Sequence, residues 1–200
     1  MTPQYTELQL DALRELANIA SGGAATALSQ MLGQEVELNV PRALALGLAD
    51  AVDAAGAPDE VVSGIVLGLE GDIDGLVLLL VPMKDAQTLC QLLGVDAGTE
   101  VGDSALGEIG NILGTSYLNA IASMTGLNLM PTPPFVATDL LAAIVASVLA
   151  QSAGESDIAL VLDSDLTLAD AACALSFMLL PASGRADDLL APLGLADPGA

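Results

Sequence analysis

The chain has 200 residues, enough for a substantial hydrophobic core, and 53% of them are apolar although only 2% are aromatic, so a folded protein with an aliphatic core is expected. Its 26 acidic side chains against 4 basic ones give a formal net charge of −22. This balance argues against a nucleic-acid partner and against an anionic membrane surface, because both require clustered Lys and Arg.

The acidic residues are spread through predicted turns and helix faces and do not form a terminal tail. That distribution favours adaptation to a salt-rich cytoplasm, where counter-ions screen self-repulsion; an ordinary acidic bacterial protein is the alternative. Residues 1–7 have no basic stretch of a signal peptide, so we expect a cytoplasmic protein. The apolar run within 140–154 is shorter than the ~20 residues that cross a bilayer, and it predicts a buried helix without membrane insertion.

The first predicted element is a long helix over residues 7–31, because its apolar side chains recur at helical spacing. They are Leu10, Leu13, Ala17, Ala20, Ala24, Leu28 and Met31. Five shorter elements complete this half: a strand at Val36–Val40, a helix around 45–54, strands at 61–69 and 75–81 joined by a turn at 72–75, and a short helix after Pro82. Gly33 and Gly94 stand where helices are expected to end.

The second half repeats the same order. Its long helix covers 103–124 and carries Leu106, Ile109, Leu113, Tyr117, Ala120 and Met124 at the matching spacing. The following elements are a strand at Leu127–Met130, a helix over 136–151, strands at 157–163 and 171–180 joined at 163–165, and a short helix after Pro181 that ends at Gly194. We predict an α+β fold: one pseudo-twofold-symmetric domain spanning 1–200, with repeats at about 7–94 and 100–194 sharing a β-sheet, and a tail at 195–200.

Each long helix also carries a polar stripe opposite its apolar one. The stripe is the same in both helices: an acid or Ser, a Glu four residues later and an Asn three residues after that, all on one face. The residues are Asp11, Glu15 and Asn18 in the first helix and Ser104, Glu108 and Asn111 in the second, 93 positions apart. Simple solvent exposure or duplication of the chain would also produce such a stripe. Asn in the middle of both helices argues against that explanation, because Asn is a mediocre helix former.

The stripe extends to a proline and then resembles a known family. Asp or Ser, three residues, Glu, two residues, Asn, twenty-two residues and Pro is the motif of the CheC/CheX/FliY phosphatases, and its two copies here end at Pro41 and Pro134. Residues 18–33 also resemble the first helix of CheC, and the resemblance covers about 7–194. Two copies are typical of the CheC type and not of one-site CheX, and an added switch-protein domain of the FliY kind is not expected. With the acidic composition, the resemblance leads us to expect a halophilic archaeon as the source.

The resemblance implies a phosphatase that removes the aspartyl phosphate of a CheY-type response regulator in chemotaxis. It assigns Asn18 and Asn111 to orienting the attacking water, and Glu15 and Glu108 to pairing with a lysine of the regulator. An amide suits this task because it can accept from and donate to one water, and the chain has no histidine to act as a base. The Mg²⁺ would belong to the regulator, so no cofactor or metal site of this chain is expected.

Other chemistries find no support in the sequence. The only lysine, Lys84, follows no Gly-rich loop, so a Walker A nucleotide site is absent, and catalysis through a His base is impossible. Cys90 and Cys173 have no cationic neighbours in sequence and are expected to be buried hydrophobic residues. The acids at 163–170 lack the Glu that closes a calcium loop, so a solvated hairpin turn is expected there.

Two other functions remain open. The chain can instead be an adaptor that binds and regulates the receptor deamidase CheD, with weak or no catalysis; residues 136–151 are then the candidate contact, although they fit a buried core helix equally well. A structural subunit of a flagellar switch has no supporting extra domain. Arg14 beside Glu15 is either a partner contact or a charge-balancing surface residue, and we favour the second.

Overall fold

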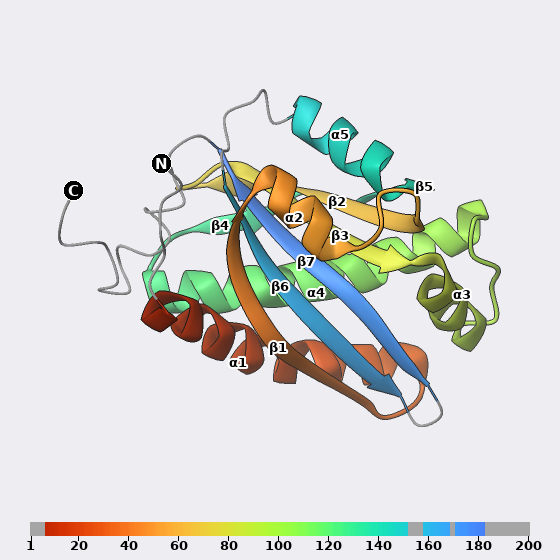
Figure 1. Ribbon diagram of the computed structural model, residues 1–200. Coiled ribbons are helices and arrows are strands. Elements are labelled where there is room, and N and C mark those ends of the chain that lie inside the picture. Colours follow the sequence, from red (N-terminus) through yellow and green to blue (C-terminus); the bar gives the residue numbers. More distant parts are fainter. Residues whose placement is uncertain (1–6, 152–157, 169–170, 183–200) are drawn as a thin grey trace.

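A mixed sheet-and-helix architecture is described by the computed structural model for residues 7–151, 158–168 and 171–182 (Figure 1). Its helices are α1 (Glu7–Leu32), α2 (Leu48–Ala55), α3 (Met83–Leu92), α4 (Glu100–Thr125) and α5 (Leu141–Gln151). Its strands are β1 (Val36–Gly47), β2 (Val61–Gly71), β3 (Gly75–Pro82), β4 (Leu129–Pro131), β5 (Phe135–Leu140), β6 (Ile158–Leu168) and β7 (Ala172–Pro181). The helix predicted after Pro181, its Gly194 cap and the tail lie outside the described residues.

The strands form one sheet in the order β1-β6-β7-β3-β2-β4, and β5 pairs with β2 alongside β4. Every pairing is antiparallel. Each half contributes its first strand to the other half: β1 pairs with β6, whereas β4 and β5 pair with β2. The pseudo-twofold axis therefore passes between β3 and β7, which pair at the centre. The predicted α+β fold of two repeated halves on a shared sheet is confirmed.

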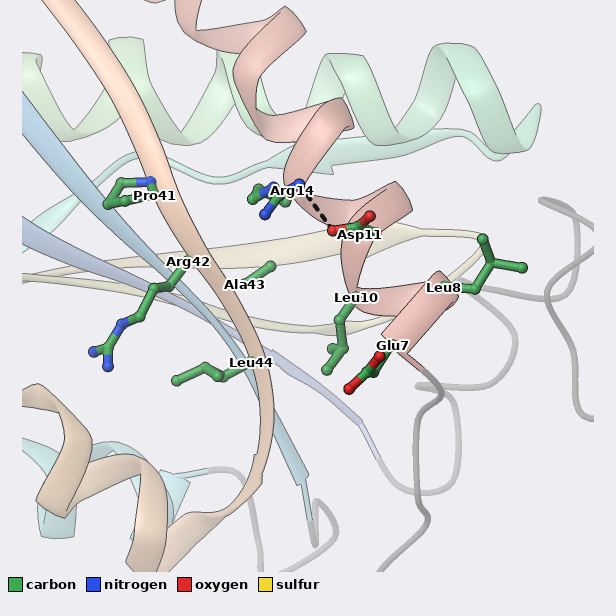
Figure 2. Close-up of a pocket in the computed structure, with 9 residues that line it drawn as sticks. All are labelled: Glu7, Leu8, Leu10, Asp11, Arg14, Pro41, Arg42, Ala43 and Leu44. Atoms are coloured by element: carbon green, nitrogen blue, oxygen red, sulfur yellow. Dashed lines mark ion pairs between the residues drawn. The ribbon is translucent and has the colours of Figure 1, made fainter.

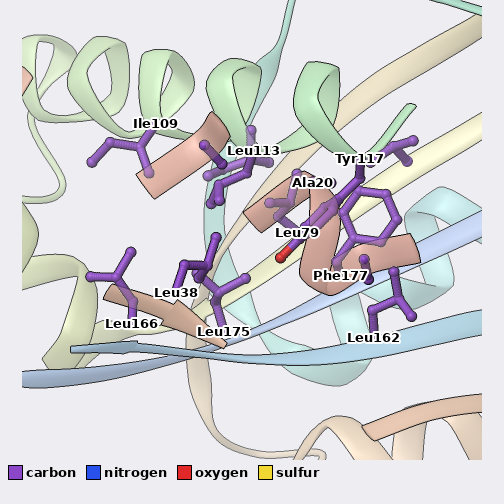
Figure 3. Packing of buried hydrophobic residues seen from close by; sticks show 14 of the residues in the cluster. Ala20, Leu38, Leu79, Ile109, Leu113, Tyr117, Leu162, Leu166, Leu175 and Phe177 are labelled. Atoms are coloured by element: carbon purple, nitrogen blue, oxygen red, sulfur yellow. The ribbon is translucent and has the colours of Figure 1, made fainter. Parts of the chain in front are cut away.

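The sheet separates two hydrophobic clusters. The larger one packs α1, α3 and α4 against one face, and the smaller one packs α2 and α5 against the other. Figure 3 shows part of the larger cluster, in which aliphatic side chains surround Tyr117 and Phe177, whose rings meet edge to face at 4.9 Å between centroids. Aliphatic packing of this kind follows from a composition with so few rings. Of the described rings, Phe135 alone points outward, with 68% of its surface exposed.

Local signals fix the position of α4. Thr99 caps its first turn, because its side chain accepts the Gly102 N–H at 3.1 Å. The acidic side chains of Glu100 and Asp103 in the first turn stabilise the helix by interacting with the positive end of its dipole. Gly126 ends the helix in the left-handed conformation, with φ of 73°. Within the helix, a Cβ on Gly110 would lie 2.5 Å from Cγ2 of Ile65, so this glycine lets α4 pack closely on β2.

Two helix predictions were wrong at their starts. The helix predicted around 45–54 begins at Leu48, because β1 continues to Gly47 along β6. Residues 136–140, predicted as helix, form β5, and the helix begins only at Leu141. In both cases an apolar stretch pairs with a neighbouring strand, and this long-range pairing outweighs the local helical pattern.

The turn predicted at 163–165 was also wrong. Asp163 and Asp165 lie inside β6, opposite Ser176 and Ala174 of β7. The Asp163 carboxylate is tolerated in a strand because the Arg42 guanidinium from β1 pairs with it, and the Ser176 hydroxyl donates to it at 3.1 Å. The hairpin closes further on, where the Leu168 N–H donates to the carbonyl of Ala171.

The apolar stripe of each long helix is largely buried as predicted, except that Met124 is 51% exposed. In α5 the apolar side chains Leu141, Ile144, Val145 and Val148 are buried against the sheet. No helix in the described ranges is both long and apolar enough to cross a membrane.

Candidate active sites on the two long helices

The two polar stripes lie on neighbouring helices that run in opposite directions. Helices α1 and α4 pack side by side beneath the sheet, with the first turn of α1 at one end of the pair and that of α4 at the other (Figure 1). The first turn of α1 adjoins β1, which carries Pro41, and that of α4 adjoins Pro134, which directly precedes β5. The six stripe residues therefore form two separate sites, one for each half of the chain.

The first site is a shallow hollow of about 510 Å³ between the start of α1 and the middle of β1. Asp11 lines the hollow with an exposed carboxylate, and the carboxylate of Glu15 is exposed on the next turn of the helix. Arg14 stands between them and pairs with Asp11 at 2.8 Å and with Glu15 at 3.9 Å, as Figure 2 shows for the closer pair. Pro41 and Arg42 line the strand side of the hollow. The favoured interpretation of Arg14 as a charge-balancing residue agrees with these contacts.

Asn18 lies one turn further along α1, and its half-buried amide contacts backbone on both sides. Its Nδ2 atom donates to the carbonyl of Arg14 at 3.0 Å and to that of Val40 at 3.2 Å. Its Oδ1 atom accepts the Val40 N–H at 3.0 Å. The amide therefore connects α1 to β1 immediately before the motif proline.

The second site is a hollow of about 570 Å³ between the start of α4 and the start of β5. Ser104 and Glu108 are exposed at its helix side, and Ser104 donates its hydroxyl to the Glu100 carbonyl at 2.9 Å. Gly107 occupies the position of Arg14, so no basic side chain of the described residues pairs with Glu108. A Cβ built on Gly107 would lie 3.6 Å from Cγ of Pro134, which shows that this proline packs directly on the helix.

Asn111 is half-buried like Asn18 but has different partners. Its Oδ1 atom accepts the hydroxyl of Thr115 at 3.4 Å, a long hydrogen bond. Within the described part of the chain, its Nδ2 atom has no hydrogen-bond partner. The residue that corresponds to Val40 at the 93-residue offset is Pro133, which has no N–H to donate.

Sequence reasoning missed two residues that shape these hollows. Arg42 and Phe135 follow the motif prolines directly and line the strand side of the first and second hollow. They occupy corresponding positions, so comparing the residues after the two prolines would have found them. The strand side of one hollow thus carries an arginine, whose guanidinium pairs with Asp163, where the other carries an exposed ring.

Both cysteines lie among buried residues and are free, as the sequence predicted for small hydrophobic side chains. Burial, followed by the nearby Asp103 and Asp96 carboxylates, raises the pKa of the Cys90 thiol. Burial, with a smaller effect from Asp85, raises the pKa of Cys173 to about 11. Both thiols stay protonated at neutral pH, so neither is an activated nucleophile. The described residues contain no cluster of three His, Cys, Asp or Glu side chains placed to hold a metal ion.

Comparisons with known proteins match the same segments. The chain matches the CheC-like family over residues 8–44 and 101–137, which contain the two motif copies. It is 36% identical over 168 residues to the CheY-P phosphatase CheC of Bacillus subtilis, covering 80% of each chain. It is 34% identical over 104 residues to the flagellar motor switch phosphatase FliY of the same bacterium, covering 52% of this chain and 26% of FliY. Among solved structures, Thermotoga maritima FliY shares the fold with a TM-score of 0.72 at 18% identity, covering 95% of this chain and 96% of that one.

Proposed function

The chain belongs to the CheC-like family, and from this premise we propose that it hydrolyses the aspartyl phosphate of a CheY-type response regulator. The observation that carries the proposal is the complete motif, present twice, with an exposed Glu carboxylate and an Asn amide one turn further along the same helix face. Glu15, Asn18, Glu108 and Asn111 are the proposed functional residues. Asp11, Ser104 and the two motif prolines support them.

The chemistry needs little from this chain beyond positioning. An aspartyl phosphate is an activated acyl phosphate, and phosphoryl transfer gains most from alignment and electrostatics. A water oxygen attacks phosphorus opposite the aspartyl oxygen, and the phosphorus–oxygen bond to the aspartate breaks. The products are inorganic phosphate and a free aspartate carboxylate. An Asn amide can hold that water by accepting a hydrogen bond from one of its O–H groups and donating an N–H to its oxygen.

Docking is proposed to depend on the Glu residues. An exposed carboxylate on a helix face can pair with a lysine of the regulator, and this pair fixes where the following Asn lies. We place Mg²⁺ in the regulator, where it would neutralise the phosphoryl oxygens. We also place the reaction in the cytoplasm, and the acidic surface leads us to retain a halophilic, archaeal source as part of the proposal.

A dephosphorylation series tests the assignment. Loss of phosphate from the phosphorylated regulator is measured with wild-type protein, Asn18→Ala, Asn111→Ala and the double variant. Because the proposed role of the motif amide is to position the attacking water, the double variant, which keeps neither amide, should lose about 10²-fold or more of the added rate. Asn119→Ala is the matched control, since Asn119 is an exposed asparagine on α4 outside both hollows. A double variant as active as wild type would sink the assignment.

The alternative is an adaptor that binds and regulates the receptor deamidase CheD. The apolar side of α5, the expected contact, is buried on the sheet, which supports its role as a core helix. What stays accessible beside it is a groove of about 450 Å³ whose lining includes Ala143, Ser147 and Phe135. Wild-type protein that binds CheD without hydrolysing the regulator's phosphate would favour this function.

A further inference from the structure

We infer that the two motif copies are unequal and that turnover takes place at the second copy. The Asn18 amide is held by hydrogen bonds to the N–H and carbonyl of Val40, which we call the backbone clamp. Asn111 has no such clamp. Val40 and Pro133 are the positioning residues that set this difference. The inference deepens the proposed function and rests on it, because it assigns that activity to one of two sites.

The hydrogen-bond inventory of Asn18 is the first observation. A side-chain amide has two N–H donors. Both donors of Asn18 are used, one by the Arg14 carbonyl and one by the Val40 carbonyl, and its oxygen accepts the Val40 N–H. No donor remains to hold the oxygen of a water. In this conformation Asn18 is a structural link and cannot orient a nucleophile.

The course of β1 explains why Val40 is available for this contact. The pairing of β1 with β6 shifts register between Asn39 and Arg42, so Val40 and Pro41 sit in an irregular step of the ladder. The Val40 N–H and carbonyl consequently face Asn18 and not the neighbouring strand. The Val40 side chain is 2% exposed, which holds this step of the strand in place.

The second half cannot form the clamp, because a proline replaces the residue that donates the N–H. Pro133 takes the place of Val40, and its ring nitrogen carries no hydrogen. The bond that holds the Asn18 oxygen therefore cannot form at Asn111. The Asn111 oxygen meets the Thr115 hydroxyl at 3.4 Å, and its two N–H donors have no partner in the described residues. Asn111 retains the capacity to donate to a water and to accept from it.

Charge around the two hollows points the same way. Arg14 and Arg42, two of the chain's four basic residues, line the first hollow, and Arg14 contacts Glu15. A lysine approaching Glu15 would meet the Arg14 guanidinium, and like charges side by side oppose docking, whereas the Arg42 guanidinium is paired with Asp163. At the second hollow Gly107 and Phe135 replace them, so Glu108 faces an approaching lysine without a competing cation.

The first experiment opens the clamp where only Asn18 can act. Asn111→Ala silences the second copy. In that background, Val40→Pro gives residues 40–41 the Pro-Pro sequence that residues 133–134 have in the second half. Removing one hydrogen bond should shift the Asn18 amide toward its free form and raise hydrolysis by about tenfold over Asn111→Ala alone. A gain of rate cannot arise from structural damage. A folded double variant with no gain overturns the inference, as does Asn111→Ala alone at the wild-type rate.

The reciprocal variant covers the case in which Val40→Pro does not fold. Pro133 is exposed, and Pro133→Val supplies the missing N–H beside Asn111. We expect kcat to fall about tenfold with KM unchanged, because regulator docking through Glu108 is untouched. Pro133→Ala should give the same fall, since the effect comes from the N–H and not from the side chain. Unchanged kcat in both variants overturns the inference.

Hydrogen exchange separates this inference from the proposed function. The Val40 amide should exchange slowly in the wild-type protein and at least about tenfold faster in Asn18→Ala, which removes its acceptor. A Val40 amide that exchanges freely in the wild type overturns the clamp, whatever the activity. Wild-type protein with a protected Val40 amide and no hydrolysis at all overturns the proposed function instead.

Discussion

Side-chain identity at corresponding positions is what distinguishes the two halves. Arg14 and Gly107 occupy the same helix position, and Arg42 and Phe135 follow the two motif prolines. Two of the chain's four basic residues, Arg14 and Arg42, line the first hollow together with Glu7 and Asp11. The charged residues that line the second hollow are all acidic: Glu100, Asp103 and Glu108. Partner preference is therefore expected to differ between the hollows at the level of single residues.

The buried thiols give a prediction for pH. The pKa of Cys173 rises from 9.0 to about 11 on burial, so the folded state keeps a proton that the unfolded state releases. Between these values the folded state binds more protons, and the free energy of unfolding must fall as pH rises. We expect the melting temperature to decline from about pH 9 toward pH 11, and less so in Cys173→Ala.

The rate at which a thiol reagent modifies the two cysteines provides an independent check of their burial. In the native protein at pH 8, a thiol reagent should modify Cys90 and Cys173 only as fast as the fold opens, whereas in denaturant both should react at once. Rapid modification of the native protein would contradict their burial. Modification should not remove activity selectively, because neither thiol lines the hollows at the two motif copies.

The sequence could place the motif residues but not their contacts. Helical spacing alone put Glu15 and Asn18 on one face; in the structure Glu15 is exposed and Asn18 contacts β1. The clamp between Asn18 and Val40 joins residues 22 positions apart through an irregular strand step, and no local pattern encodes that step. The roles of the four motif residues in hydrolysis stay predictions.

Helix α4 depends on glycines to approach the sheet, which gives a prediction for this element. Gly110→Ala would place a Cβ 2.5 Å from Ile65, a fully buried residue, so the helix or the strand must shift. We expect a loss of about 1–3 kcal/mol in the free energy of unfolding, measured by denaturant titration.

Gly23→Ala in α1 is the matched control for that substitution. Gly23 is exposed, and a Cβ there meets no atom within 4 Å. Alanine is a better helix former than glycine, so this variant should gain about 0.5–1 kcal/mol. Equal effects of the two substitutions would show that α4 does not pack on β2 as closely as described.

Elements with strong local patterns were predicted well, and elements defined by their neighbours were not. The two long helices and the β2–β3 hairpin follow from apolar spacing and turn residues. Residues 136–140 became a strand because β2 offers an edge to them, with Val136 opposite Ile65, and residues 45–47 extended β1 along β6 for the same reason. Such pairing depends on the assembled sheet and is not visible in a sequence window.

The charge of the whole molecule gives a prediction for salt. A net charge of −22 on one folded chain opposes compaction, and screening relieves this as the Debye length falls from about 10 Å at 0.1 M to about 3 Å at 1 M salt. We expect the melting temperature to rise by at least about 5 °C between these KCl concentrations. The same concentrations of a neutral osmolyte provide the control for general solvent effects. A melting temperature indifferent to KCl would remove the inference of adaptation to salt.

The first strands of each half pair with a strand of the other half, and this pairing limits which sequence changes the duplicated chain tolerates. An insertion in β1 would disturb β6, and one in β5 would disturb β2, so neither repeat can vary its backbone as an independent module. The interval from Asn to Pro is accordingly 23 positions in both copies. What stays free to diverge is the set of side chains bordering each hollow, so a symmetric framework can support two specialised faces.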